Sequence, residues 1–587
     1  MCQQRGCAAE SFTNYLTRRD RHLNPARPTP SVAIFAYLAW HAGDMPADLP
    51  QESAREELIQ VIRSGYTFDE PAIDLGVLSV DDEPVPGARI RIPLAMLNRH
   101  GLVSGATGTG KTITLQVLAE QIAQSGVPVF AADIKGDLSG MASAGEPNEK
   151  LLARAAKNGQ DWQPAASAVE FYALGGQGKG IALRATISSF GPVLLSKVLG
   201  LNETQESSLG LVFHYADGAG LPLLDLEDLV ALLRYLDSDA GKPELKQIGG
   251  LSSQTVGVIL RAIVNLEQQG AGVFFGEPEF DSHDLLRTTP DGRGVVSMLE
   301  LPNVQDRPAL FSTFLMWLLA DLYHDLPEVG DADRPKLVFF FDEAHLLFNG
   351  ASKAFVQQIT QTVRLIRSKG VGVFFVTQTP KDVPADVLAQ LGSRIQHQLR
   401  AHTPNDAKAL KATVSTFPRS GYDLGELLTQ LGIGQAVVTV MDPDGAPTPV
   451  AWTRIFAPQS KMGPTDPGRI DQIIAASPLT ARYGQQINRD SAYEMLARKL
   501  ASGAESAQAE SRAQPASRAT RADGMPLVTD NARSAQPKSS ATRKTTRTPK
   551  AEKSVIEQVA SSSVAKQFAR SAGREIVRSL FGTARRR

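Results

Sequence analysis

Short apolar runs recur through the middle of the chain, separated by stretches with helical periodicity. A run of about five apolar residues between turn residues is typical of a buried strand, and strands covered on both faces read as continuous apolar runs. Runs of this kind are Gly101–Ser104, Pro128–Asp133, Gly294–Glu300, Lys336–Asp342, Val371–Thr377 and Arg394–Leu399. Strands that alternate with helices predict an α/β fold with a mainly parallel sheet and helices on both faces.

The pattern also divides the chain into segments. Residues 1–65 read as an N-terminal extension, partly disordered, and residues 66–100 as a small strand-rich segment. We expect the main domain to cover residues 66–460. Residues 185–290 within it are predicted to be a helical insertion, because this segment is too long for a simple crossover between strands and has mostly helical periodicity. Residues 461–500 read as a short helical extension with a single helix near its end.

The C-terminal part differs in composition. Residues 501–553 are rich in Ser, Ala, Thr, Pro, Lys and Arg, which predicts a disordered linker. Residues 554–587 regain helical periodicity with interleaved Lys and Arg, which predicts a basic amphipathic helix. Residues 501–587 contain 17 basic and 7 acidic residues, whereas the first 500 contain 44 and 55. A basic tail on an acidic body indicates a contact with nucleic acid, an anionic membrane or an acidic partner, or else a merely solvated tail.

Cysteine usage and hydropathy exclude some classes. The two cysteines, Cys2 and Cys7, cannot form a four-ligand zinc site, and no disulfide framework is possible elsewhere in the chain. The N-terminus lacks the pattern of a signal peptide. The longest apolar runs, Val32–Trp40 and Phe314–Ala320, are shorter than the ~20 residues that span a bilayer. We therefore expect a cytoplasmic protein with no transmembrane segment.

A complete phosphate-binding loop follows the first of the apolar runs. The pattern G-x-x-x-x-G-K-[ST] is filled by Gly105, Ala106, Thr107, Gly108, Thr109, Gly110, Lys111 and Thr112. The glycines allow the backbone N–H groups to point at phosphate oxygens, and the following helix N-terminus adds partial positive charge. Lys111 is expected to reach the β- and γ-phosphates, and the Thr112 hydroxyl to ligate Mg²⁺. The motif predicts ATP and Mg²⁺ as ligands.

A pair of carboxylates ends the apolar run Leu337–Phe341. In a parallel sheet, the carboxyl ends of the strands form the edge where ligands bind. We expect Asp342 to hold Mg²⁺ and Glu343 to act as the general base that activates water. The letters Asp-Glu-Ala-His at 342–345 also occur in one class of helicase. The other motifs of that class are absent from the core, so we do not assign the chain to it.

Further candidates lie around the run Val371–Thr377. Gln378 is the first candidate for a sensor of the γ-phosphate, and Thr377 the second, because both lie at the ligand-binding edge. Arg364 and Arg367 lie on a predicted helix just upstream. They either decorate a solvated face or supply an arginine finger to the ATP of a neighbouring subunit. Arg394 is a rival for the second role.

These motifs, taken in order, resemble the HerA–FtsK superfamily of ring-forming ATPases, and more closely the bacterial HerA-like (YjgR-like) family. The resemblance covers about residues 70–460. The segments that carry it are Asn98–Gly101 leading into the phosphate loop, Ala132–Leu138, the Phe-rich run into Asp342-Glu343, and Val376–Thr379.

The resemblance implies a RecA-like core, ATP hydrolysis at subunit interfaces, a hexameric ring and action on double-stranded DNA as a helicase or translocase. It also implies that Gln378 is the sensor and that Arg367, eleven residues before it, acts in trans. Asp133 and Asp137 match a family feature without an assigned role and are alternatively helix caps. The β-barrel that opens HerA is not evident in residues 1–100.

Two other functions remain open at this stage. The chain could be an ATPase that remodels or assembles protein complexes without DNA. It could also be recruited to a membrane surface by its basic C-terminal helix.

Overall fold

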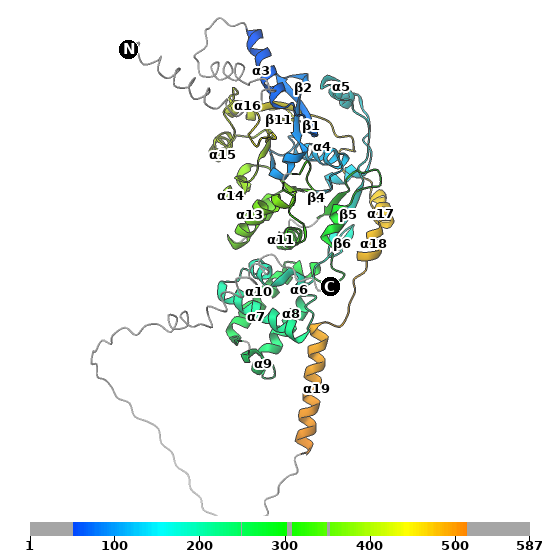
Figure 1. Cartoon of the computed structure of the whole chain (residues 1–587), viewed down its shortest axis with the longest axis vertical. Helices are drawn as coiled ribbons and strands as arrows, with labels where there is room; N and C mark the ends of the chain where they lie inside the picture. The colour runs from blue at the N-terminus through cyan, green and yellow to red at the C-terminus, as the bar shows by residue number, and fades with distance from the viewer. Residues whose placement is uncertain (1–50, 248, 302–307, 331, 349–352, 514–587) are drawn as a thin grey trace, which may run out of the picture.

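The computed structural model describes residues 51–247, 249–301, 308–330, 332–348 and 353–513 (Figure 1). Their strands form one twelve-stranded sheet in the order β2-β1-β12-β11-β10-β3-β9-β8-β4-β7-β5-β6. The strands are β1 (Ala72–Val80), β2 (Glu83–Pro93), β3 (Gly101–Ser104), β4 (Val129–Asp133), β5 (Val169–Leu174), β6 (Ile181–Leu183), β7 (Val296–Glu300), β8 (Leu337–Phe341), β9 (Val371–Thr377), β10 (Ser393–Gln396), β11 (Gln435–Thr439) and β12 (Ala451–Ile455).

The sheet has a parallel part and an antiparallel part. From β10 to β6 every neighbouring pair is parallel. On the other side of β10, the successive pairs β10–β11, β11–β12, β12–β1 and β1–β2 are antiparallel. The prediction of an α/β, RecA-like core with a mainly parallel sheet is confirmed.

The helices that precede β7 in the chain are α3 (Gln51–Gly65), α4 (Lys111–Gln124), α5 (Glu149–Lys157), α6 (Ile187–Val198), α7 (Glu203–Ala219), α8 (Leu226–Asp237), α9 (Lys242–Gln247) and α10 (Ser253–Gln268). The later helices are α11 (Pro308–Asp325), α12 (His345–Phe348), α13 (Lys353–Ile366), α14 (Ala385–Leu388), α15 (Pro404–Val414), α16 (Leu424–Gln430), α17 (Pro467–Ala476), α18 (Pro478–Tyr483) and α19 (Ala492–Ala513).

Both faces of the parallel sheet are buried, which explains the continuous apolar runs. In β8, Phe339 and Phe341 belong to the core beneath α11 and α13, whereas Val338 and Phe340 belong to the core beneath α4. Successive side chains of a strand point to opposite faces, so a strand covered on both sides must be apolar at every position. All five residues of β8 are fully buried.

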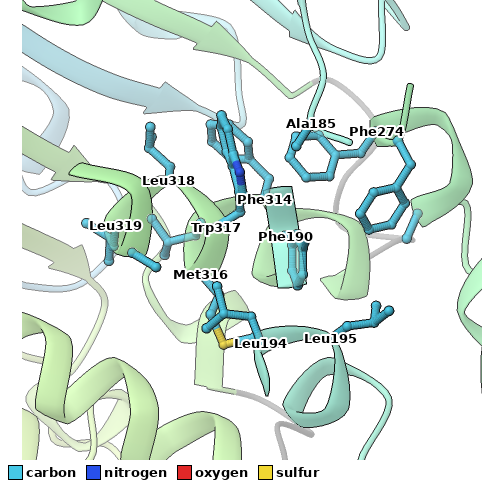
Figure 2. Packing of buried hydrophobic residues seen from close by; sticks show 14 of the residues in the cluster. Ala185, Phe190, Leu194, Leu195, Phe274, Phe314, Met316, Trp317, Leu318 and Leu319 are labelled. Carbon is cyan, nitrogen blue, oxygen red and sulfur yellow. The ribbon is translucent and has the colours of Figure 1, made fainter. Parts of the chain in front are cut away.

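The helices α6 to α10 lie between β6 and β7 and gather at one end of the sheet, beside the long helix α19 (Figure 1). Several of them begin at side-chain caps: Asn202, Asp225 and Ser252 each accept a hydrogen bond from a backbone N–H of the first turn. Helix α11 connects this group to the sheet. Figure 2 shows its Phe314 and Trp317 packed with Phe274. The ring centroid of Phe274 lies 5.7 Å from that of Phe314 and 5.6 Å from that of Trp317.

The structure differs from the sequence predictions in several places. Strands β5 and β6, at the sheet edge before the helical insertion, and strands β11 and β12, in the antiparallel part, form where no strand is expected from the pattern. Residues 461–513 hold three helices, whereas a single helix is expected over residues 461–500. The prediction of a disordered linker from residue 501 is wrong for residues 501–513, because α19 continues to Ala513; five of these thirteen residues are Ala, the residue that most favours helix.

Other predictions concern residues outside the described ranges. They are the disorder within residues 1–50, the linker over residues 514–553 and the basic helix over residues 554–587. Residues 51–100 form α3 and the β1–β2 hairpin, with a 3₁₀ helix at Leu94–Arg99. Among the described residues, no helix has the combination of length and apolarity that crossing a bilayer requires.

Candidate nucleotide-binding site

The order of the central strands gathers the predicted site at one edge of the sheet. Strand β9 lies between β3, which leads into the phosphate loop, and β8, which leads into the carboxylate pair. All three are parallel, so their carboxyl ends share that edge. The Gly105 N–H donates to the carbonyl of Thr377 at 3.2 Å, and the Ala344 N–H to that of Val376 at 2.9 Å. The loop and the carboxylate turn are thus both attached to the end of β9.

The phosphate loop curls between β3 and α4. Gly108 and Gly110 have φ angles of 80° and 113°, which side chains rarely adopt. The Gly105 and Ala106 N–H groups are used within the fold, whereas those of Thr107, Gly108 and Gly110 have no hydrogen-bond partner among the described residues. These N–H groups and the N-terminus of α4 therefore form a cradle for an anion.

Lys111 closes this cradle. Its ammonium donates to the Ala106 carbonyl at 3.1 Å, and its side chain is largely buried. Burial lowers the pKa of Lys111, and the charges of Glu343 and Asp342 oppose that effect. The lysine thus lies between the loop and the carboxylate pair, where a terminal phosphate would meet it. Thr112, the next residue, is half-buried in the first turn of α4.

The carboxylate pair is buried at the end of β8. The Glu343 N–H donates to Asp342 Oδ1 at 2.9 Å, and Glu343 has a φ of 47°, in the left-handed region. Burial raises the pKa of Asp342 to about 6, and the charge of Glu343 adds to this. A carboxylate with a raised pKa gains from a nearby cation, because the cation favours the charged form. Asp342 is therefore suited to a metal ion beside the phosphate loop.

Glu343 has an ion-pair partner that the sequence does not indicate. Lys135, in the turn after β4, donates from Nζ to Glu343 Oε1. His345 Nδ1 lies 3.2 Å from the other oxygen, Oε2. Burial alone would raise the pKa of Glu343, but the hydrogen bond and charge of Lys135, with the charges of His345 and Lys111, together hold it below its usual value.

The two sensor candidates lie in different surroundings. Thr377 is fully buried, and its hydroxyl donates to Asp382 Oδ2 at 2.6 Å. Gln378 is exposed, and among the described residues no hydrogen bond reaches its side chain. Its amide is therefore available at the edge that holds the phosphate loop, whereas the Thr377 hydroxyl is already engaged.

The candidate arginines are not near the phosphate loop of their own chain. Arg364 is exposed on α13, and Arg367 is exposed in the turn Arg367–Lys369 that precedes β9. This turn is at the opposite edge of the sheet, because the seven residues of β9 separate it from Gln378, roughly 20 Å along the strand. Arg394 is half-buried within β10 and lies beside Leu102 rather than at a strand end.

Two residues that follow β10 also support the loop. His397 is fully buried, with Nε2 2.9 Å from the Thr114 hydroxyl and Nδ1 2.8 Å from the Gln435 carbonyl. Arg400 donates to the Thr107 carbonyl at 3.3 Å. Neither follows from a local motif, because both contacts join residues far apart in the sequence. Among the described residues, no cluster of three or more His, Cys, Asp or Glu side chains is placed to hold a metal ion by itself.

The remaining family feature is the turn after β4. Asp133 Oδ1 accepts from the N–H groups of Lys135 and Gly136, and Oδ2 accepts from that of Leu138. This geometry favours the capping alternative for Asp133. Asp137 is the first residue of the 3₁₀ helix Asp137–Ala142 and makes no cap hydrogen bond there.

Comparison with known proteins finds several to which this chain is similar in part. A probable helicase of Methanocaldococcus jannaschii, MJECL08, is 29% identical over 153 residues, and the match spans 24% of this chain and 28% of that protein. The plasmid coupling protein TrwB, in its complex with ADP and Mg²⁺, aligns with a TM-score of 0.44 at 16% identity over 69% of this chain and 94% of that one. VirB4 of Thermoanaerobacter pseudethanolicus gives 0.40 at 14% identity over 69% of this chain and 100% of that one.

The family is decided by the match that covers the largest part of this chain. The sequence profile described as helicase HerA-like C-terminal matches residues 79–587, which is most of the chain and includes every residue of the candidate site. The resemblance seen in the ordered motifs is thereby confirmed. This chain belongs to the helicase HerA-like C-terminal family of P-loop ATPases.

Proposed function

We propose that this protein hydrolyses ATP with Mg²⁺ and uses the turnover to move along or separate double-stranded DNA. The observation that carries the hydrolysis is the position of β9 between β3 and β8. It brings the phosphate loop, the carboxylate pair and Gln378 to one edge of the sheet, as phosphoryl transfer to water requires.

Each residue has a defined task in this proposal. The loop N–H groups and Lys111 bind the phosphates of the substrate. Thr112 and Asp342 would hold Mg²⁺, which would supply positive charge to offset that of the phosphates. Glu343 takes the proton of the attacking water. Gln378 donates a hydrogen bond to the γ-phosphate or orients that water.

The ring assembly is part of the same proposal. None of the three candidate arginines lies at the phosphate loop of its own chain, and Arg400, which does contact the loop, donates to the Thr107 carbonyl. In this proposal Arg367 of a neighbouring subunit completes the site. Head-to-tail contacts form rings when the rotation between subunits closes, and we propose a hexamer. Family membership and the name of the relative MJECL08, a probable helicase, support the proposal of DNA as the substrate. Because the first 500 residues are acidic overall, contact with DNA would depend on local basic segments and on salt.

Steady-state ATP turnover tests this proposal, measured with and without double-stranded DNA across a salt series. We expect stimulation by DNA that fades as salt rises, because neutralised phosphates release counterions. Turnover that is unchanged by DNA at low salt would support ATP hydrolysis but contradict the DNA motor. It would favour an ATPase that remodels protein complexes. Absence of turnover under all conditions would contradict the hydrolysis itself.

A further inference from the structure

The turn after β4 holds a lysine beside the candidate catalytic base. Asp133 is 1% exposed and accepts three backbone hydrogen bonds, at 3.2, 2.7 and 2.8 Å, from Lys135, Gly136 and Leu138. A carboxylate that accepts three N–H groups fixes the path of the backbone around it. The left-handed φ of 78° at Gly136 completes this tight turn. The position of the Lys135 backbone is therefore set by the fold and not by the lysine side chain.

The sheet places this turn next to the carboxylate pair. Strand β4 pairs with β8 in parallel, with Ala132 beside Phe341, so that both strands end together. From there, Lys135 extends to Glu343 and forms an ion pair with Oε1. Glu343 is almost fully buried, whereas the lysine side chain is 37% exposed. The ion pair thus joins a buried base to a cation that solvent and ligands can still reach.

This contact conflicts with the task assigned to Glu343. A general base needs a free lone pair directed at the attacking water, but Oε1 of Glu343 is engaged by Lys135, and the buried Oε2, which has no hydrogen-bond partner among the described residues, faces His345 Nδ1 at 3.2 Å. The backbone of Glu343 is held separately, through its N–H bond to Asp342. The side chain can therefore exchange partners without a change in the strand.

We propose that Lys135 is a phosphate-sensing residue, which leaves Glu343 for the γ-phosphate of ATP and so frees the base only when a triphosphate is bound. This inference rests on the proposed ATPase function. The ammonium then donates its hydrogen bond to a phosphate oxygen instead of a carboxylate oxygen, and no proton is transferred. A nucleoside diphosphate lacks the competing anion, so Lys135 remains on Glu343. Lys135 is thus a positioning residue for the base as well as a ligand for the substrate.

Nucleotide binding, rather than turnover, tests the inference. Dissociation constants for ADP and for ATPγS are measured with Mg²⁺ on the full chain and on its variants. We expect Lys135→Ala to weaken ATPγS about tenfold, the size of one charge-assisted hydrogen bond, and to leave ADP within about twofold. Lys135→Arg should restore part of the difference. The control is Lys150→Ala, which removes an exposed lysine on α5 and should change neither constant.

A double-mutant cycle identifies the competition with Glu343. Glu343→Gln removes the charge that holds Lys135, so ATPγS should bind more tightly. That gain should disappear in the Lys135→Ala, Glu343→Gln double variant, because the two residues act through one contact. Equal loss of ADP and ATPγS in Lys135→Ala, or a gain that persists in the double variant, would overturn the inference.

The result separates this inference from the proposed function. If the wild type binds both nucleotides and hydrolyses ATP but Lys135→Ala shows no selective loss of ATPγS, only the role of Lys135 fails. If ATPγS discrimination depends on Lys135 but no turnover occurs, the hydrolysis fails and the sensing contact remains.

Discussion

His397 joins the end of β10 to the helix that begins in the phosphate loop. Its Nε2 lies 2.9 Å from the hydroxyl of Thr114, and its Nδ1 lies 2.8 Å from the carbonyl of Gln435. A carbonyl only accepts, so Nδ1 carries the proton and Nε2 accepts from the threonine. A neutral imidazole therefore supports α4 from the side, directly behind Gly105, where an added Cβ would meet the Cβ of His397 at 2.5 Å.

Removing this support should weaken both the fold and nucleotide binding. His397→Ala leaves the Thr114 hydroxyl and the Gln435 carbonyl buried without a partner, and we expect a loss of about 2–4 kcal/mol in the free energy of unfolding. Denaturation in urea and ADP titration measure the two effects. The control is His214→Ala, an exposed histidine on α7. Equal stability of the two variants would contradict the role given to His397.

Acid should destabilise the protein through two buried histidines. Burial lowers the pKa of His100 and of His397 to about 4. The unfolded chain binds a proton at each near pH 6.5, whereas the folded chain does not. The contribution of each histidine to the free energy of unfolding is therefore fully present above pH 6.5 and is lost as the pH falls toward 4. The expected loss is about 2 kcal/mol per histidine between pH 7.5 and pH 5.

Urea denaturation at these two pH values measures that loss. In His397→Gln the difference between the two values should shrink by the share of one histidine, although the variant is less stable at both. An unchanged difference would mean that His397 is not the neutral, buried group described above.

The two central site residues should fail in different ways. Lys111→Ala removes the cation that faces the phosphates, so nucleotide binding should be lost. Glu343→Gln keeps the cradle intact and removes the base, so ATP should still bind while turnover falls by about 10²–10⁴-fold. Filter binding and phosphate release distinguish the two outcomes. Equal turnover in the wild type and Glu343→Gln would exclude Glu343 as the base.

How much of this the sequence predicts depends on how local the determining interactions are. The phosphate loop, β3 and β9 follow from motifs and apolar runs within a few residues, and the predicted bounds of both strands agree with the structure. Strand β6 has only three residues and β5 contains Glu170, so neither produces a clear apolar run. Their strand character comes from the pairing of β5 with β7 and of β6 with β5, which no local pattern reports.

The parts of the site that escape prediction are long-range contacts. Lys135 and Glu343 are 208 positions apart, and Thr114 and His397 are 283 apart. A lysine after a strand or a histidine in an apolar stretch has no distinctive local spacing. Only the order of the strands brings each to its partner. The same holds for Arg400, which reaches Thr107 from 293 positions away.

Arg367 should act on the site of a neighbouring subunit. It lies at the opposite edge of the sheet from its own phosphate loop, so it cannot reach the nucleotide bound there. Arg367→Ala should lower turnover about a thousandfold or more, as expected for an arginine finger, while nucleotide binding persists. Arg364→Ala, one helical turn earlier and equally exposed, is the matched control and should remain active.

Mixing two inactive variants distinguishes action in trans from a structural defect. Subunits with Lys111→Ala lack a phosphate site but supply Arg367, and subunits with Arg367→Ala have a phosphate site but lack the arginine. In a randomly mixed ring about a quarter of the interfaces combine an intact site with an intact arginine, so turnover should return to that fraction of the wild-type rate. A mixture that stays inactive, together with loss of activity in Arg364→Ala or Arg394→Ala, would transfer the role to one of those residues.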